Sequence, residues 1–336
     1  DRDCVSTMRV HGREIAEAAK IPGPKYSTDP KELRTFAEPP VVKCDGLAAG
    51  KGVVICGDEE TALISLRSMM DEREFGAAGE KLVVEEFMAG EEASVFAVCD
   101  GKDYVTLAPA QDHKRVFDND QGKNTGGMGA YAPAPIVTPG VMQKVKREII
   151  EPTLRGMASE GRPYKGCLYV GLMITPDGPK VVEFNSRFGD PETQVVLPLY
   201  GGDLVDLILA SCDRTISSQK DHGEEYPTHG SSVCVVLASG GYPDKYQTGK
   251  RIDGLHNLAG LNGVVAFHAG TKRLDDAIVT AGGRVLGVTA ISTSSDLEKT
   301  IRMAYDGVRR ISFDGMHYRH DIGGKALVYQ HAATIA

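Results

Sequence analysis

A carboxylate, an amide and a guanidinium recur at every second residue near the middle of the chain, at Glu183, Asn185 and Arg187. The apolar pair Val181 and Val182 precedes them and predicts a β-strand. Because side chains alternate in direction along a strand, the three polar groups should leave one face. Carboxylate and amide oxygens suit a hard cation such as Mg²⁺, and the guanidinium suits a phosphate or carboxylate bound to that cation. The alternative is a strand that ends in a charged surface turn.

A glycine-rich segment at residues 45–52 offers a place for phosphate groups. Its glycines, Gly50 and Gly52 among them, let backbone amides approach phosphate oxygens, and Lys51 adds a mobile charge. It is not a P-loop, because the Gly-x₄-Gly-Lys-Ser/Thr pattern is missing and a strand is expected after it. We interpret it as a flap that can fold over a triphosphate, with a plain hairpin as the alternative.

Charged residues on the neighbouring strands fit a nucleotide as well as ordinary ion pairs. Lys43, in an apolar strand, requires an anion or a water-filled cleft, which a structural ion pair or nucleotide phosphates would supply. Glu85 and Glu86 are adjacent on a strand and should point to opposite faces, so one of them is available to a ribose or an adenine amino group. Glu92 is a further candidate for a sugar hydroxyl. Each carboxylate taken singly also fits a surface position.

Residues 111–115 place a histidine among opposite charges, and the glycine-rich residues 126–129 follow. The glycines are suited to close approach of the backbone to a ligand, so the segment fits a substrate clamp, with a solvated charged loop as the alternative. His113 has an ordinary pKa suited to proton transfer, and an orienting hydrogen bond is an equal alternative. His317 and His320 have no third ligand nearby in the sequence, so we expect them at the surface and not in a metal site.

Hydrophobic periodicity indicates the elements that would position these groups. Strands are expected at 41–44, 53–56, 82–87, 93–99, 168–174 and 180–184. Helices are expected at 5–20, 30–36, 58–70, 138–161 with an interruption near Pro152, and from Asp203. Residues 104–135 should form a long polar loop. Beyond a polar boundary at 214–231, strands are expected at 232–238, 264–269 and 284–290, followed by a capped helix from Ser295 to about Arg310.

Composition narrows the class of protein. The chain has 336 residues, enough for two or three domains. Its net charge of −8 and the absence of Trp argue against a nucleic-acid surface. The seven cysteines are scattered, and no apolar run approaches the ~18 residues of a membrane span. We therefore expect a reducing, cytoplasmic location and no membrane partner. The first residue is Asp1, so a fragment of a longer chain is an expectation.

Two oxygen ligands, a glycine flap with a lysine and a polar anion-binding loop together describe Mg²⁺-dependent phosphoryl transfer from ATP. No Ser-His-Asp arrangement, GxSxG or strand-linked GxGxxG is visible.

These motifs, in this order, resemble the glycinamide ribonucleotide synthetase (phosphoribosylamine–glycine ligase) family of ATP-grasp enzymes in purine synthesis. The matching segments are 45–52, 85–92, 111–115, 124–131, 183–192, 240–243, 267–271 and 282–286. Ser186 stands where that family is expected to have Cys, a harmless change. Residues 1–37 match only a linker, loosely, so the family's N-terminal α/β domain, which helps to form the phosphoribosylamine pocket, is expected to be lacking. The family also occurs fused to a downstream synthase.

The resemblance implies a mixed α+β and α/β architecture: an ATP-grasp fold of two α+β subdomains that clasp ATP, plus a small C-terminal β-rich domain. The implied parts are a helical lead-in at 1–39, a lid at 40–104, a core with the metal and substrate site at 105–225, the C-terminal domain at 226–325, and a tail or linker at 326–336.

The resemblance also implies that ATP phosphorylates glycine and that the amine of 5-phosphoribosylamine then displaces the phosphate. Mg²⁺ or Mn²⁺ would be held by Glu183 and Asn185. The nucleotide would be bound by Lys43, Gly50, Lys51, Gly52, Glu85, Glu86 and Glu92. The substrates would be oriented by Arg187, Asp190, Asp112 and Lys114. The alternatives are another ATP-grasp carboxylate–amine ligase, a biotin-carboxylase-like enzyme, or a non-catalytic ATP-binding remnant.

Overall fold

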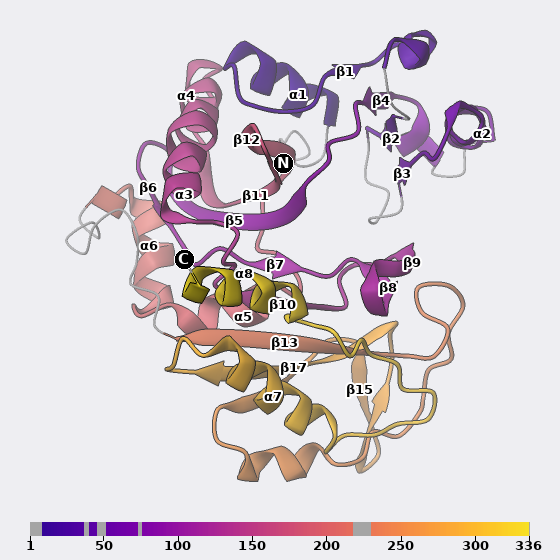
Figure 1. Cartoon of the computed structure of the whole chain (residues 1–336), viewed down its shortest axis with the longest axis vertical. Helices are drawn as coiled ribbons and strands as arrows, with labels where there is room; N and C mark the ends of the chain where they lie inside the picture. Colours follow the sequence, from indigo (N-terminus) through magenta and orange to yellow (C-terminus); the bar gives the residue numbers. More distant parts are fainter. Residues whose placement is uncertain (1–8, 37–39, 46–51, 73–75, 218–229, 336) are drawn as a thin grey trace. The chain divides into compact units, whose positions relative to one another are not determined.

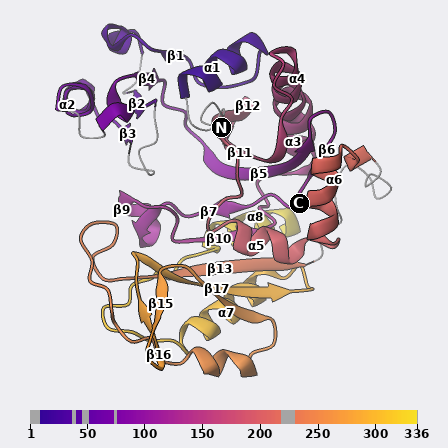
Figure 2. The ribbon, with the colours of Figure 1, turned by 180° about the vertical axis from the view of Figure 1, so that it is seen from behind.

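The structure is a computed structural model that describes residues 9–36, 40–45, 52–72, 76–217 and 230–335. The chain forms two compact units, each assembled from three separate stretches of sequence. Unit 1 comprises residues 1–105, 137–188 and 207–221, and unit 2 comprises residues 106–136, 189–206 and 222–336. Figures 1 and 2 show the ribbon from opposite sides.

The long strands of unit 1 form an antiparallel sheet in the order β12-β11-β5-β6. The strands are β5 (Glu91–Asp100), β6 (Tyr104–Thr106), β11 (Lys165–Thr175) and β12 (Gly178–Asn185). β5 is buried from Ala93 onward, which explains its continuous apolar run. The strand begins two residues before the predicted start, at Glu91. On β12, Val182 is an extra residue, because Glu183 pairs with Gly171 while Val181 pairs with Leu172. This β-bulge lies directly before the polar end of the strand.

A second sheet in unit 1 has the order β1-β4-β2-β3. Its strands are β1 (Tyr26–Ser27), β2 (Val41–Cys44), β3 (Val53–Ile55) and β4 (Leu82–Glu85). The predicted helix at 58–70 is confirmed as α2 (Glu59–Met70), and the Asp58 carboxylate caps it by accepting a 2.7 Å hydrogen bond from Thr61 N. Its apolar face packs on the sheet in a core of Leu33, Val42, Cys44, Cys56, Ala62, Leu66, Met69, Leu82 and Val84. Short 3₁₀ segments lie at η1 (Pro30–Thr35) and η2 (Gly76–Gly79).

The remaining helices of unit 1 lie along the first sheet. They are α1 (Arg9–Ala18), α3 (Pro139–Val145), η4 (Lys146–Ile150) and α4 (Glu151–Ser159). Figure 1 shows α1 and α4 side by side near β12, in agreement with the contacts between them. The predicted interruption near Pro152 takes the form of a π-helical turn, η4, after which Pro152 lies in the first turn of α4, where a proline is tolerated.

Unit 2 is built on a sheet of order β14-β17-β13-β10-β7. The strands are β7 (Gln111–Asp112), β10 (Gly129–Ala132), β13 (Ser231–Ala238), β14 (Val264–His268) and β17 (Arg284–Ser292). The helix predicted from Ser295 is confirmed as α7 (Leu297–Val308), capped by Asp296, and it packs on β13 and β17 (Figures 1 and 2). It does not close the chain, because helix α8 follows it. The other elements are β8 (Arg115–Phe117), η3 (Asp118–Asp120), β9 (Gln121–Asn124), α5 (Thr193–Val196), η5 (Leu197–Leu199), η7 (Leu255–Gly260), β15 (Thr271–Leu274), β16 (Ala277–Thr280) and α8 (Gly324–Ile335). Helix α6 (Leu204–Asp213) begins in unit 2 and continues in unit 1, and the Asp203 carboxylate accepts from Val205 N at its start, as predicted.

The prediction of one long loop at 104–135 is wrong, because strands β6 to β10 lie within it. These strands have two to four residues each, too few to show a period of two. The prediction of a surface position is also wrong for His317, which is half-buried with its Nε2 2.9 Å from Val116 O. His320 is exposed, as expected.

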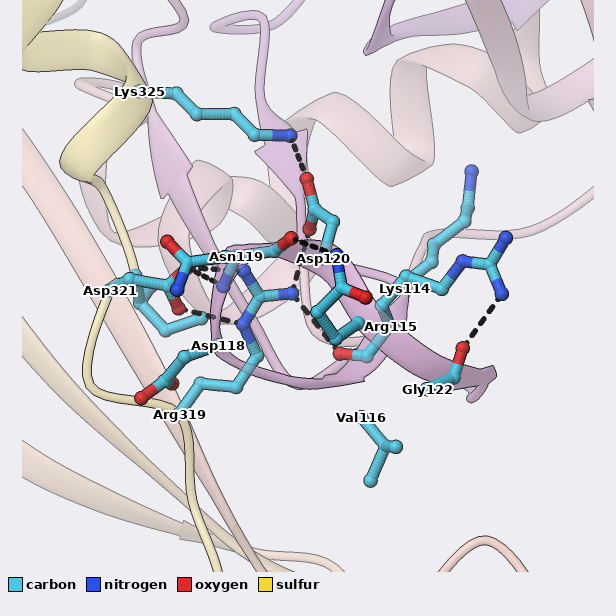
Figure 3. A network of polar contacts seen from close by, with 12 residues as sticks. Lys114, Arg115, Val116, Asp118, Asn119, Asp120, Gly122, Arg319, Asp321 and Lys325 are labelled. Carbon is cyan, nitrogen blue, oxygen red and sulfur yellow. Dashed lines mark hydrogen bonds and ion pairs between the residues drawn. The ribbon is translucent and has the colours of Figure 1, made fainter.

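Arg319 anchors the β8–β9 hairpin to the C-terminal segment of unit 2 (Figure 3). Its side chain is fully buried. Nε and Nη2 donate to the two oxygens of Asp321 at 2.8 and 2.7 Å, and Nη1 donates to Asp120 Oδ1 at 2.8 Å. Lys325 Nζ lies 2.5 Å from the second oxygen of Asp120. Because Asn119 and Asp120 both have left-handed φ values, of 57° and 53°, these contacts hold a turn that would otherwise be strained.

Replacement of Arg319 by Met should lower the free energy of unfolding by about 3 kcal/mol, because it removes a buried cation on which two carboxylates depend. Urea denaturation followed by circular dichroism would measure the change. Arg302, whose exposed side chain pairs with Glu298, provides the control, and Arg302→Met should cost less than about 0.5 kcal/mol. Equal effects of the two substitutions would contradict an anchoring role for Arg319.

Candidate functional site

The polar end of β12 places Glu183 and Asn185 on one face, as the alternation predicts. Asn185 Nδ2 donates to Glu183 Oε1 at 3.2 Å, and both side chains are half-buried. Arg9 Nη1 lies 3.7 Å from the other Glu183 oxygen. The amide nitrogen of Asn185 therefore points to the Glu183 carboxylate, and the amide oxygen, Oδ1, is the atom of Asn185 that can bind a cation. Arg187 is exposed, and its Nη1 donates to the carbonyl of the next residue, Phe188, at 2.8 Å.

This donor set fits a hard divalent cation. A carboxylate and an amide oxygen are ligands that Mg²⁺ accepts, and Mg²⁺ commonly takes only one or two protein ligands beside phosphate and water oxygens. Among the described residues no group of three or more His, Cys, Asp or Glu side chains is arranged to hold a metal. Glu183 and Asn185 suit a cation that a phosphate ligand helps to coordinate.

The carboxylate of Glu85 lies buried between two cations of unit 1. Lys43 Nζ is 2.5 Å from Oε2, and Arg13 Nε donates to Oε1 at 2.7 Å. Burial opposes ionisation of Glu85, but the charges of Lys43 and Arg13 outweigh it and hold the pKa of Glu85 below its usual value. Burial lowers the pKa of Lys43, against the attraction of Glu85. Of the two alternatives for Lys43, the structure shows the ion pair.

The other predicted nucleotide residues of unit 1 lie around this pair of sheets. Glu86 follows β4 and is half-buried, and its Oε1 accepts from Lys25 N at 3.0 Å. Glu92 is half-buried on β5. The Gly52 carbonyl accepts from Cys44 N at 2.8 Å. Gly50 and Lys51 lie outside the described residues.

The remaining predicted substrate residues, Asp112, Lys114 and Asp190, belong to unit 2. Lys114 Nζ lies 3.8 Å from Asp112 Oδ1. The exposed Asp190 is fixed at both oxygens, because Gln194 Nε2 donates to Oδ1 and Arg284 Nη2 donates to Oδ2, each at 2.9 Å.

Arg284 and Gln194 were missed as site residues by the sequence interpretation. Arg284 Nη1 also donates to the carbonyls of Gly126 at 2.7 Å and of Asp190 at 2.8 Å. It therefore connects β17 with two of the motifs that carry the resemblance. Arg284 lies in segment 282–286, one of the segments that resemble the family, and this position could have marked it as a site residue. Gly127 lies in the same loop with φ of 111°, and a Cβ there would come within 2.4 Å of Pro191 Cδ, so only glycine fits.

His113 is almost fully buried, and within the described part of the chain neither ring nitrogen has a hydrogen-bond partner. Its ring centroid lies 5.9 Å from that of Tyr131. Burial, and then the positive charges of Arg319 and Lys325, lower the pKa of His113 to about 4. The residues that the structure describes therefore offer His113 no orienting hydrogen bond, and its ring is neutral at pH 7.

The sheets and the polar end of β12 define an ATP-grasp domain. The family model described as the phosphoribosylglycinamide synthetase ATP-grasp (A) domain matches residues 7–193, and the model for the C domain of the same synthetase matches residues 232–325. Together they match more than half of the chain, which therefore belongs to the phosphoribosylamine–glycine ligase family.

Individual relatives agree with this assignment. The chain is 47% identical to phosphoribosylamine–glycine ligase of Chlorobaculum tepidum over 96% of this chain and 76% of that protein. It is 47% identical to a bifunctional purine biosynthetic protein of Pichia angusta over 85% of this chain and 36% of that protein. The crystal structure of phosphoribosylamine–glycine ligase from Thermotoga maritima is similar with a TM-score of 0.82 and 34% identity, covering 94% of this chain and 78% of the other.

Biotin carboxylase from Campylobacter jejuni shares the fold alone, with a TM-score of 0.68 at 11% identity over 94% of this chain and 68% of the other. The prediction of an ATP-grasp fold is confirmed.

The burial of His113 should make stability fall with acid. Its folded pKa of about 4 lies below the unfolded value of about 6.5, so the unfolded chain binds the proton first. The contribution is complete above pH 6.5 and is lost as the pH falls toward 4, which amounts to about 2 kcal/mol between pH 7 and pH 5. Urea unfolding of wild type and of His113→Leu at both pH values would measure the difference in slope. The exposed His256 is the control: His256→Leu should keep the wild-type slope, and a wild-type slope in His113→Leu would contradict the assignment.

Proposed function

We propose that this chain catalyses the ATP-dependent ligation of glycine to 5-phosphoribosylamine, giving glycinamide ribonucleotide, ADP and phosphate in de novo purine synthesis. The observation that carries the proposal is the match of both synthetase domain models, in order, together with relatives named phosphoribosylamine–glycine ligase at 47 and 48% identity. The structure supports the proposal because the oxygen atoms of Glu183 and Asn185 on β12 suit a cation that is also bound to phosphate.

The reaction requires two substitutions. A glycine carboxylate oxygen attacks the γ-phosphorus of ATP, the bond from that phosphorus to the β–γ bridging oxygen breaks, and ADP leaves. The amine nitrogen of 5-phosphoribosylamine then attacks the acyl carbon of glycyl phosphate, the carbon–oxygen bond to phosphate breaks, and the nitrogen loses a proton. Phosphorylation is needed because a free carboxylate has no adequate leaving group. The protein contributes mainly by positioning and by electrostatic stabilisation.

The chain's own residues fit these tasks. Glu183 and Asn185 would hold Mg²⁺ or Mn²⁺, which when bound neutralises charge on the phosphate oxygens. The proposed nucleotide contacts are Lys43, Gly50, Lys51, Gly52, Glu85, Glu86 and Glu92. Lys43 Nζ also lies 2.5 Å from Glu85 Oε2 and donates to Val182 O at 3.4 Å, so its positive charge is held next to β12. The proposed substrate contacts are Asp112, Lys114, Arg187 and Asp190.

Release of ADP from ATP and Mg²⁺ tests the activity, measured with glycine and with or without freshly generated 5-phosphoribosylamine. The proposal expects release that needs both substrates. ATP hydrolysis that depends on bicarbonate would instead indicate a biotin-carboxylase-like enzyme. ATP binding without release, even when the family's N-terminal domain is added in trans, would indicate a non-catalytic remnant. Among the described residues, no helix has the length and apolar character to span a membrane.

Substitution of Glu183 by Gln should reduce the turnover by roughly 100-fold or more while the fold survives, because the change removes the only full charge of the donor pair. Steady-state ADP release and the circular dichroism spectrum would be compared with those of wild type. Glu148→Gln, at a half-buried carboxylate on η4 that pairs with Arg147, is the matched control and should retain full activity. Unchanged turnover in Glu183→Gln would remove Glu183 from the site.

A further inference from the structure

Arg13, on α1, makes three hydrogen bonds inside unit 1, although no local sequence pattern marks it as a site residue. Its side chain is 8% exposed. Nε donates to Glu85 Oε1 at 2.7 Å, Nη1 donates to Val181 O at 3.1 Å, and Nη2 donates to Val182 O at 2.9 Å. Two of the three acceptors are therefore backbone carbonyls of β12, immediately before Glu183.

The two carbonyls belong to the β-bulge of β12. Val182 is the residue without a partner on β11, since Val181 pairs with Leu172 and Glu183 pairs with Gly171. A bulge disrupts the ladder and re-aims the side chains that follow it. The Val182 carbonyl accepts from Arg13 Nη2 and lies 3.4 Å from Lys43 Nζ. The side chains of two buried cations thus replace the strand partner that the bulge removes.

We propose that Arg13 is a positioning residue for the cation site: by holding the Val181 and Val182 carbonyls it fixes the bulge, and the bulge sets the direction of Glu183. The inference rests on the proposed function, because the site that it positions is the proposed cation site. Arg13 itself would touch neither the cation nor the nucleotide.

The guanidinium is suited to this task because its donors form a rigid planar fork that reaches three acceptors at once. Glu85 holds the same fork from the opposite side, so the carboxylate fixes Arg13 and also compensates its charge. A lysine at position 13 would keep the charge but would not reproduce the three-way geometry. Arg13→Lys therefore separates geometry from charge.

Gly23 provides a second, independent variant. A Cβ at this position would lie 3.2 Å from Arg13 Nη1 and 3.8 Å from Val181 O. The backbone there does not require glycine, since Gly23 does not have a positive φ. Gly23→Ala should consequently displace Nη1 by a few tenths of an ångström without backbone strain. Its effect should resemble that of Arg13→Lys and be smaller.

The test measures binding of Mn²⁺ in the presence of a non-hydrolysable ATP analogue, by electron paramagnetic resonance of the free ion. Arg13→Lys should weaken Mn²⁺ binding by about 10-fold or more, and Gly23→Ala should weaken it by a smaller factor. Arg155→Lys, at an exposed arginine on α4, is the matched control and should bind Mn²⁺ as wild type does. The Mn²⁺ concentration for half-maximal ADP release should rise in parallel, whereas the KM for glycine should not.

A purely structural role would lower the melting temperature without changing the Mn²⁺ affinity of the folded fraction. Wild-type affinity in folded Arg13→Lys overturns the inference while the proposed function stands. If Arg13→Lys fails to fold, Gly23→Ala decides, and wild-type affinity in that variant overturns the inference. Failure of wild type itself to bind Mn²⁺ with the nucleotide analogue overturns the proposed cation site and the inference with it.

Discussion

The arrangement of unit 1 depends on a buried carboxylate, Glu85, that forms ion pairs with two cations. Glu85 lies on β4, Lys43 on β2 and Arg13 on α1, and the two cations also reach the carbonyls of β12. Removing the Glu85 carboxylate would leave two buried cations without a counter-charge, which costs several kcal/mol. The small sheet, the helix and the long sheet are therefore fixed to each other by charge pairing as well as by apolar packing.

Unit 2 contains a similar buried ion-pair network with the charges reversed, in which one cation pairs with two carboxylates. The fully buried guanidinium of Arg319 is compensated by Asp120 and Asp321, and hydrogen bonds from Arg319 and Asn119 N outweigh the effect of burial and lower the pKa of Asp321 to about 2. The consequence is a hairpin held by a segment about 200 residues away in the sequence. Burial, and then the positive charges of Arg319 and Lys325, lower the pKa of the neighbouring His113 and keep its ring neutral.

The sequence predicted features that depend on local patterns. The alternation of polar residues on β12 placed Glu183 and Asn185 together, and helix α2 followed from its cap and apolar spacing. Contacts distant in sequence could not be predicted: Arg13 meets Glu85 72 residues away and Val181 168 residues away, and nothing in the local pattern of α1 marks it. The β-bulge at Val182 could not be predicted either, because the residue types of a strand do not show which residue lacks a partner on the neighbouring strand. A lysine in an apolar strand requires an anion, but either a protein carboxylate or a ligand would satisfy Lys43, and its neighbours in the sequence do not distinguish the two.

The division of each unit among three stretches of sequence has a consequence for synthesis on the ribosome. Unit 1 needs residues 207–221 to be complete, and unit 2 needs residues from 106 onward through the C-terminal part of the chain. The first half of the nascent chain therefore lacks segments that each unit needs, and the folding of each unit is completed only after those segments have been synthesised. Because each unit consists of three separate stretches, neither corresponds to one continuous fragment of the chain. A protein split at a single linker would therefore not separate the two units, and its fragments would have to reassemble to complete both.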